Sequence, residues 1–148
     1  MWYSGLLAVI VALPFAGAVL AALLSSNARN AEAWLAGTIA ASALAITITA
    51  FPHVSNGGVI RHTIEWVPAL GLSLTFRMDG FAWLFSAMIT GIGLLVVIYA
   101  RYYMSPKDPV ARFYAFFLAF MGAMQGLVLS GNLIMLAIFW ELTSIFSF

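Results

Sequence analysis

The sequence has no cysteine among its 148 residues and very few charged side chains. Without cysteine it can hold no disulfide framework, no thiolate metal site and no catalytic thiol. Charged residues make up 7% of the chain and hydrophobic residues 64%, whereas a soluble domain is about a quarter charged and about half apolar. A chain so poor in charge could not cover itself with a solvated surface, so the composition predicts an integral membrane protein.

The sequence lacks the motifs of several classes of function. The net charge is only +1 and no basic run is present, so nucleic acid is not an expected partner. There is no glycine-rich phosphate loop, no pair of carboxylates in one predicted element and no nucleophile elbow. His53 and His62 fall in one loop without an acidic partner pattern. We therefore expect a protein that is not an enzyme and that binds no cofactor and no metal.

Long apolar runs predict an all-α membrane protein. A membrane-spanning barrel would instead show alternating segments of about ten residues. A spanning helix needs about 20 mostly apolar residues, and about five candidates are present. They cover residues 4–24, 34–51, 81–103, 112–129 and 133–148. A signal peptide is the alternative for the first run, but no Lys or Arg precedes it and it is long for that role.

The last apolar run begins near Leu133 and continues up to Phe148. About 16 residues at 1.5 Å each span roughly 24 Å, less than a hydrocarbon core of about 30 Å. We therefore expect a truncated final helix. The 148 residues are expected to form a single transmembrane region that is part of a longer fold.

A polar excursion, residues 52–78, separates the second and third predicted helices. Within it, "IRHTIEW" and "LSLTFR" alternate between apolar and polar positions, and "VPALG" lies between them. Period-two alternation on both sides of a Pro/Gly turn predicts a β-hairpin. Because a two-stranded hairpin is marginal alone in water, it should lie flat on the membrane or on a neighbouring subunit.

The positions of Lys and Arg predict an orientation in the membrane. The hairpin loop carries Arg61 and Arg77, on the side of the N-terminus. The loops on the opposite side carry four basic residues: Arg29, Arg101, Lys107 and Arg112. Since Lys and Arg are enriched in cytoplasmic loops, the N-terminus and the hairpin are expected outside.

Glu141 lies inside the apolar run "IFWELTSIFSF". If the last helix begins at Leu133, Glu141 is about 12 Å deep, close to the middle of the membrane. An ionised carboxylate there costs roughly 3 kcal/mol even on lenient insertion scales. The acid is therefore expected to be protonated or paired with a buried cation, and either state suits a proton carrier. The alternative is a structural acid that hydrogen-bonds another helix.

Two further polar residues are candidates to support Glu141. Ser144 follows it by three residues and shares its helix face, although such hydroxyls often bond their own helix backbone. Gln125 could face a polar interior, but a bond between two helices explains it equally well. Asp79 is expected to be a helix N-cap. Four glycines should mark close helix packing: Gly91, Gly93, Gly122 and Gly126.

Residues 61–148 resemble a known family. The stretches "HTIEWVPALGLSLTFRMDGFAWLFSAMITGIGLLVVIYARYYM" and "FYAFFLAFMGAMQGLVLSGNLIMLAIFWELTSI" are similar to the N-terminal part of the A subunit of the Mrp-type multisubunit cation/proton antiporter. That protein is related to the antiporter-like subunit of respiratory complex I. Complex I relatives typically carry glycine-rich residues after the Trp-Glu pair, where this chain has Leu142, Thr143 and Ser144. This difference favours the Mrp branch.

The resemblance implies a function for Glu141. The matching glutamate in the family pairs with a lysine on a later helix, which would lie outside these residues, and takes part in proton transfer. The implied protein is a subunit of a complex in the bacterial inner membrane that couples proton influx to Na⁺ efflux. Its partners would be the other subunits and the lipid bilayer. Two alternatives remain: a proton-pumping membrane subunit of complex I or a membrane-bound hydrogenase, and an assembly scaffold without a transport site of its own.

Overall fold

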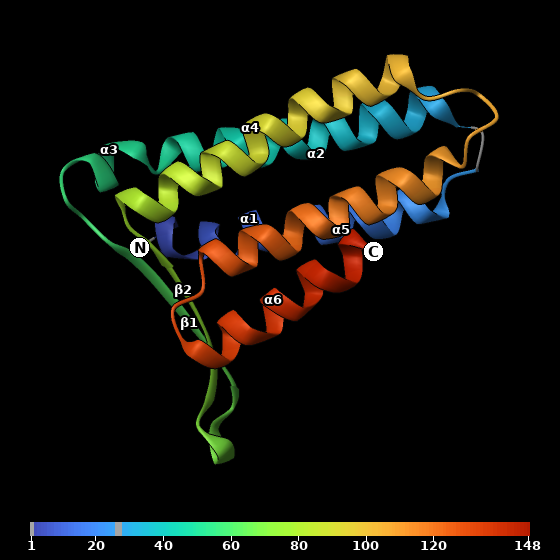
Figure 1. The fold of residues 1–148 in the computed structure, drawn as a ribbon. Helices are drawn as coiled ribbons and strands as arrows, with labels where there is room; N and C mark the ends of the chain where they lie inside the picture. Colours follow the sequence, from blue (N-terminus) through green and yellow to red (C-terminus); the bar gives the residue numbers. More distant parts are fainter. Residues whose placement is uncertain (1, 26–27) are drawn as a thin grey trace.

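The computed structural model describes residues 2–25 and 28–148, and it is mainly helical (Figure 1). Within these residues, four helical segments are long and apolar enough to cross a membrane, and a fifth apolar helix is shorter. The helices are α1 (Trp2–Leu23), α2 (Arg29–Thr49), the short α3 (Phe51–Ser55), α4 (Gly80–Tyr103), α5 (Val110–Val128) and α6 (Leu133–Ser147). The predicted all-α membrane fold with a short last helix is confirmed.

The largest boundary error lies at the start of α2. This helix begins at Arg29, not at Trp34 as predicted, and its first turn closes through the bond from the Glu32 N–H to the Ala28 carbonyl at 2.8 Å. The prediction began the helix at the first long apolar run and so left its polar first turn, with Arg29 and Glu32, in a loop.

Asp79 is the N-cap of α4, as predicted. Its Oδ1 accepts a hydrogen bond from the Ala82 N–H at 2.8 Å, and its Oδ2 lies 2.6 Å from Nη1 of Arg77. The bond from the Ala82 N–H has the largest effect on the pKa of Asp79 and lowers it, and Arg77 lowers it further. Partial burial acts in the opposite direction but does not cancel these effects. An N-cap carboxylate satisfies a backbone donor that the helix itself cannot pair, and this explains why α4 begins at Gly80.

The helices form an antiparallel bundle. Helix α1 packs along α5, α2 packs along α4, and α6 packs on α5. The N-terminus, the hairpin and the α5–α6 connection lie at one end of the bundle, and the α4–α5 connection lies at the other end (Figure 1). We call these the hairpin end and the distal end.

The predicted hairpin is present. Strand β1 (Ile60–Val67) pairs antiparallel with β2 (Leu72–Met78), in a register that places Ile60 opposite Met78. A single 3₁₀ turn, Pro68–Leu70, and Gly71 connect the strands. Gly71 has φ of +67°, a left-handed conformation that glycine adopts without steric cost.

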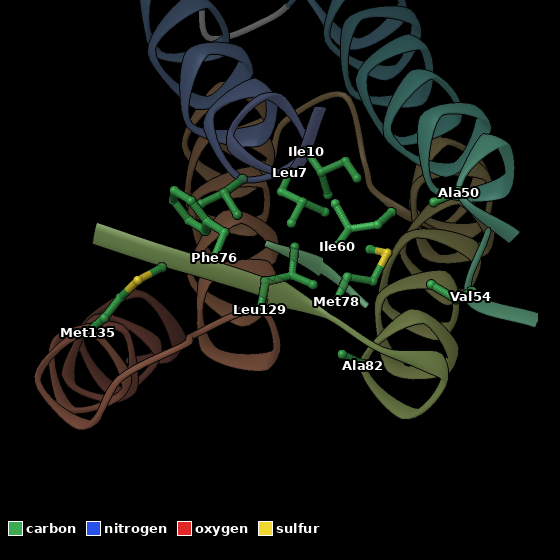
Figure 2. Packing of buried hydrophobic residues seen from close by; sticks show 11 residues of the cluster. Leu7, Ile10, Ala50, Val54, Ile60, Phe76, Met78, Ala82, Leu129 and Met135 are labelled. Carbon is green, nitrogen blue, oxygen red and sulfur yellow. The ribbon is translucent and has the colours of Figure 1, made fainter. Parts of the chain in front are cut away.

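The base of the hairpin is part of the apolar core. Phe76 and Met78 of β2 are buried against Leu7 and Ile10 of α1 and against Leu129 (Figure 2). The tip projects beyond the helices (Figure 1), and Leu70 there is 73% exposed. The hairpin therefore lies across the helix ends, anchored at its base.

Strand β2 also pairs with the α5–α6 connection. The Arg77 N–H donates to the Leu129 carbonyl at 2.8 Å, and the Gly131 N–H donates to the Thr75 carbonyl at 2.6 Å. Asn132 adds two side-chain bonds: Nδ2 donates to the Ser73 carbonyl at 2.8 Å, and Oδ1 accepts from the Met135 N–H at 2.8 Å. One side chain therefore caps α6 and joins its first turn to the hairpin.

Substitutions at Asn132 should separate these two bonds. Asn132→Asp keeps the acceptor that caps α6 but removes the donor to Ser73, whereas Asn132→Ala removes both. Because an N-cap contributes about 1 kcal/mol, the midpoint of thermal unfolding of the purified full-length protein should fall from wild type to Asn132→Asp and further to Asn132→Ala. If the two variants unfold at the same temperature, the cap contributes nothing.

Candidate functional site

Helix α6 has one face packed against the bundle. Met135 is 1% exposed, and Phe139 and Phe146 pack against the two apolar clusters of the bundle. The rings of Phe146 and Phe15 lie 6.2 Å apart between centroids. Spacings of four and seven residues place Met135, Phe139 and Phe146 on one stripe of the helix, which fixes how α6 is rotated about its axis.

That rotation turns Glu141 away from the bundle. Glu141 is exposed, and it shares a stripe with Ile134, Ile138 and Ile145, which are exposed as well. We call these four residues the outer face of α6. Within the described residues, no side-chain hydrogen bond, salt bridge or metal-binding group includes Glu141. The outer face of α6 therefore presents three isoleucines and one carboxylate.

An apolar stripe is compatible with lipid, but a carboxylate in the same stripe is not, because charge in hydrocarbon is costly. The basic residues in the described helices lie at helix ends: Arg29, Arg101 and Arg112. No such residue reaches Glu141 within the described chain. Among the described residues, the outer face of α6 therefore combines an apolar surface with an acid that has no basic partner.

Ser144 lies one turn beyond Glu141 and is exposed. Its two hydroxyl neighbours bond the helix backbone: Thr143 donates to the Trp140 carbonyl at 2.6 Å, and Ser147 donates to the Ser144 carbonyl at 3.2 Å. Among the described contacts, none joins the Ser144 hydroxyl to Glu141. Ser144 is therefore near the acid in sequence but is not shown to be its ligand.

Gln125 faces α4 and is fully buried. Its Oε1 accepts from the Ser86 hydroxyl at 2.7 Å, and its Nε2 donates to the Ser86 carbonyl at 3.1 Å. The same hydroxyl lies 3.5 Å from that of Thr47 on α2, whose carbonyl accepts a bond from the Trp83 indole at 2.7 Å. This satisfied polar network ties α2, α4 and α5 together. The structure thus gives Gln125 a bond between helices and does not bring it to Glu141.

Three of the four glycines lie in close helix contacts. A Cβ on Gly126 would overlap the Phe139 ring, one on Gly93 would overlap Met121, and one on Gly122 would lie 2.8 Å from the Phe15 ring. The prediction is wrong for Gly91, where an added Cβ meets nothing within 4 Å. Two positions that are two residues apart in a helix point to nearly opposite sides, so Gly91 and Gly93 cannot both face the neighbouring helix.

Glu32 is a buried acid that the sequence reasoning missed. It lies in the first turn of α2 and is 0% exposed, and neither carboxyl oxygen has a hydrogen-bond partner among the described residues. The predicted helix began at Trp34 and so left Glu32 in the preceding loop, where a charge is usually solvated. Its spacing carried a signal, since the buried Ala36, Ala40 and Ala43 follow it at helical intervals.

Comparison with protein families gives a match over residues 66–114, to the model described as "NADH-Ubiquinone oxidoreductase (complex I), chain 5 N-terminus". A probable K(+)/H(+) antiporter A/B subunit of Rhizobium meliloti (strain 1021) is 59% identical over 143 residues. These residues are 97% of this chain and 14% of that protein. The Na(+)/H(+) antiporter A subunit of Alkalihalophilus pseudofirmus is 54% identical over 94 residues, or 63% of this chain and 12% of that protein.

Two solved structures share the fold. The Mrp complex from Dietzia sp. DQ12-45-1b aligns with a TM-score of 0.85 at 22% identity, over 99% of this chain and 27% of that chain. An archaeal membrane-bound sulfane sulfur reductase aligns with a TM-score of 0.78 at 22% identity, over 93% of this chain and 21% of that chain. The chain is thus similar to the N-terminal portion of antiporter A subunits, and it spans about one seventh of the length of its 59%-identical relative.

Proposed function

We propose that this chain is the N-terminal portion of the A subunit of a multisubunit cation/proton antiporter in a bacterial plasma membrane, with Glu141 as a proton-transfer residue. The observation that carries the proposal is the outer face of α6, where Glu141 stands alone among exposed isoleucines. The high identity to proteins named as antiporter A subunits supports the antiport activity.

The chemistry follows from the surroundings of Glu141. While no positively charged group lies beside Glu141, its protonated, neutral form is the one compatible with an apolar face. When a basic side chain approaches, it stabilises the carboxylate, and Glu141 releases its proton. When the basic group withdraws, Glu141 takes up a proton again. By the family resemblance, the basic group is a lysine on a later helix, and this chain contributes the acid and its fixed position.

The four basic residues of the distal end favour a cytoplasmic position for that end. The N-terminus and the hairpin then face the outside. Under this proposal protons enter from the hairpin side, and a monovalent cation leaves the cell. The sequence resemblance favours Na⁺, whereas the name of the R. meliloti relative favours K⁺, so both cations belong in the test.

The test uses the full-length protein with its partner subunits, produced in a bacterial strain that lacks its own antiporters. Inverted membrane vesicles are energised to an acidic interior, and Na⁺ or K⁺ is added in separate arms. We expect one of the two cations to dissipate the pH gradient, and vesicles without the complex serve as control. Failure of both cations with an intact complex contradicts the proposal.

The second candidate is a proton-pumping membrane subunit of an oxidoreductase. The description of the matching family model, a complex I chain, favours it. Under this alternative the subunit still carries no redox centre, but its purified complex contains flavin and iron–sulfur absorbance. We expect neither chromophore in the complex. If both chromophores are present in stoichiometric amounts, redox-driven proton pumping replaces antiport as the proposed function.

A further inference from the structure

Glu32 lies at the distal end of the bundle, on a different helix from Glu141. It comes directly before Ala33 and one turn before Ala36, and both alanines belong to the apolar cluster of this end. Four helices contribute to that cluster. Besides α2, these are α1 with Ala21, α4 with Val97 and α5 with Tyr114.

The basic residue on the same helix is turned toward another group. The Arg29 guanidinium donates to the Arg101 carbonyl at the end of α4 through both Nε, at 2.8 Å, and Nη2. Within the described chain no salt bridge joins Arg29 to Glu32. The side chain of Arg101 lies over the Tyr102 ring at 5.5 Å, and Arg112 of α5 lies over the Phe116 ring at 5.8 Å. Among the described residues, no cation therefore pairs directly with the Glu32 carboxylate.

Tyr114 is the titratable group of α5 that faces this region. It is fully buried, and it lies close enough to Arg101, Arg29 and Glu32 for their charges to act on its hydroxyl. The hydroxyl donates to the Val97 carbonyl across 3.5 Å, a long bond for an O–H donor. Helix α1 adds no charged residue. Among the described residues, the charged and titratable groups near Glu32 are thus the Tyr114 phenol, whose hydrogen bond is long, and Arg29 and Arg101, whose side chains already have partners.

A single buried carboxyl group can bind only a small ligand. A buried ionised carboxylate without a partner is strongly unfavourable, whereas the neutral acid is tolerated. Among the described residues, no group of three or more acidic, histidine or cysteine side chains gathers to hold a metal ion. A single carboxyl group without a hydrogen-bond partner among the described residues fits a proton.

We propose that Glu32 is a second proton-binding site, separate from Glu141, which exchanges one proton with water at the distal end of the bundle. On release, the O–H bond of the Glu32 acid breaks and the proton passes to a water molecule. The carboxylate that remains accepts a hydrogen bond from that water or from the Tyr114 hydroxyl, which leaves the Val97 carbonyl. Uptake reverses these steps. The site does not depend on the antiport activity proposed above.

The test is infrared difference spectroscopy of the full-length protein in its native complex, recorded between low and high pH. Wild type should show the loss of a carbonyl band of a protonated carboxylic acid as the pH rises. Glu32→Gln should lose that band, because glutamine cannot ionise. Glu65→Gln is the matched control: Glu65 is exposed on β1, so this variant should keep the band. Glu141→Gln should also keep the Glu32 band, which distinguishes the two sites.

Tyr114→Phe provides a second measurement that does not need the Glu32 variant to assemble. Loss of the phenol should raise the pH at which the Glu32 band disappears, because the carboxylate form loses a hydrogen-bond donor that stabilises it. A difference spectrum of Glu32→Gln that matches wild type would overturn the proposal. If Glu32→Gln fails to assemble, loss of the band at the same pH in Tyr114→Phe as in wild type would also overturn it.

Discussion

Glu141→Gln should reduce cation/proton exchange in inverted vesicles to the background of vesicles that lack the complex. Glutamine matches the size and polarity of the neutral acid, so α6 and its outer face should remain as they are. It cannot release a proton, so the step assigned to Glu141 is lost. Proton transfer by a positioned side chain contributes roughly 10²–10⁴-fold to a rate, and we expect a loss of about this size.

Two controls make the Glu141 result specific. Glu65→Gln carries the same chemical change on an exposed hairpin residue and should exchange cations at the wild-type rate. Glu141→Asp keeps an ionisable group one methylene shorter and should retain part of the activity. If Glu141→Gln exchanges normally in a complex with all its subunits, Glu141 is a structural acid, and the proton passes elsewhere.

Gly126→Ala should displace α6 from α5. The added methyl group would overlap the Phe139 ring near its root, so a small adjustment of the ring tip cannot relieve the clash. Such overpacking typically costs about 1–3 kcal/mol, and here it also shifts the helix that carries Glu141. We expect a lower midpoint of thermal unfolding together with a severe loss of exchange.

The chain offers a matched control and a rescue for this glycine. Gly91→Ala makes the same change on α4, where an added Cβ meets open space. Since alanine favours a helix over glycine by about 1 kcal/mol, this variant should be at least as stable as wild type. Phe139→Leu should restore much of the stability of Gly126→Ala. If Gly126→Ala behaves like Gly91→Ala, the contact between α5 and α6 does not position Glu141.

The sequence predicted the helices and the hairpin well because each rests on a local pattern. A run of apolar residues as long as the membrane is thick has few other solutions, and period-two alternation around Pro68 and Gly71 specified the strands. The predicted start of α2 was wrong because a helix located by its hydropathy does not include a polar first turn. Arg29 and Glu32 are polar in sequence, but the helix there is set by backbone bonds and by packing at the distal end.

The candidate site was predictable only in part. Distance along the helix predicts a depth for Glu141 in the membrane, which remains a prediction, whereas the orientation of its side chain depends on which face of α6 meets α5. Gln125 and Glu32 show the same limit. Gln125 meets Ser86, which is 39 residues away in sequence, and Glu32 is buried by neighbours from other helices. Such contacts between distant segments leave no signature in the spacing of one segment.

Asn132 also bears on how the protein is made. Its amide bonds the Ser73 carbonyl, 59 residues earlier in the chain, so the hairpin leaves the ribosome well before α6 does. Chains generally fold from the N-terminus during synthesis. A hairpin already docked on α1 then offers the emerging α5–α6 connection a strand edge, through Thr75 and Ser73, before the first turn of α6 forms. The nascent hairpin would act as a template that sets the starting register of the helix carrying Glu141.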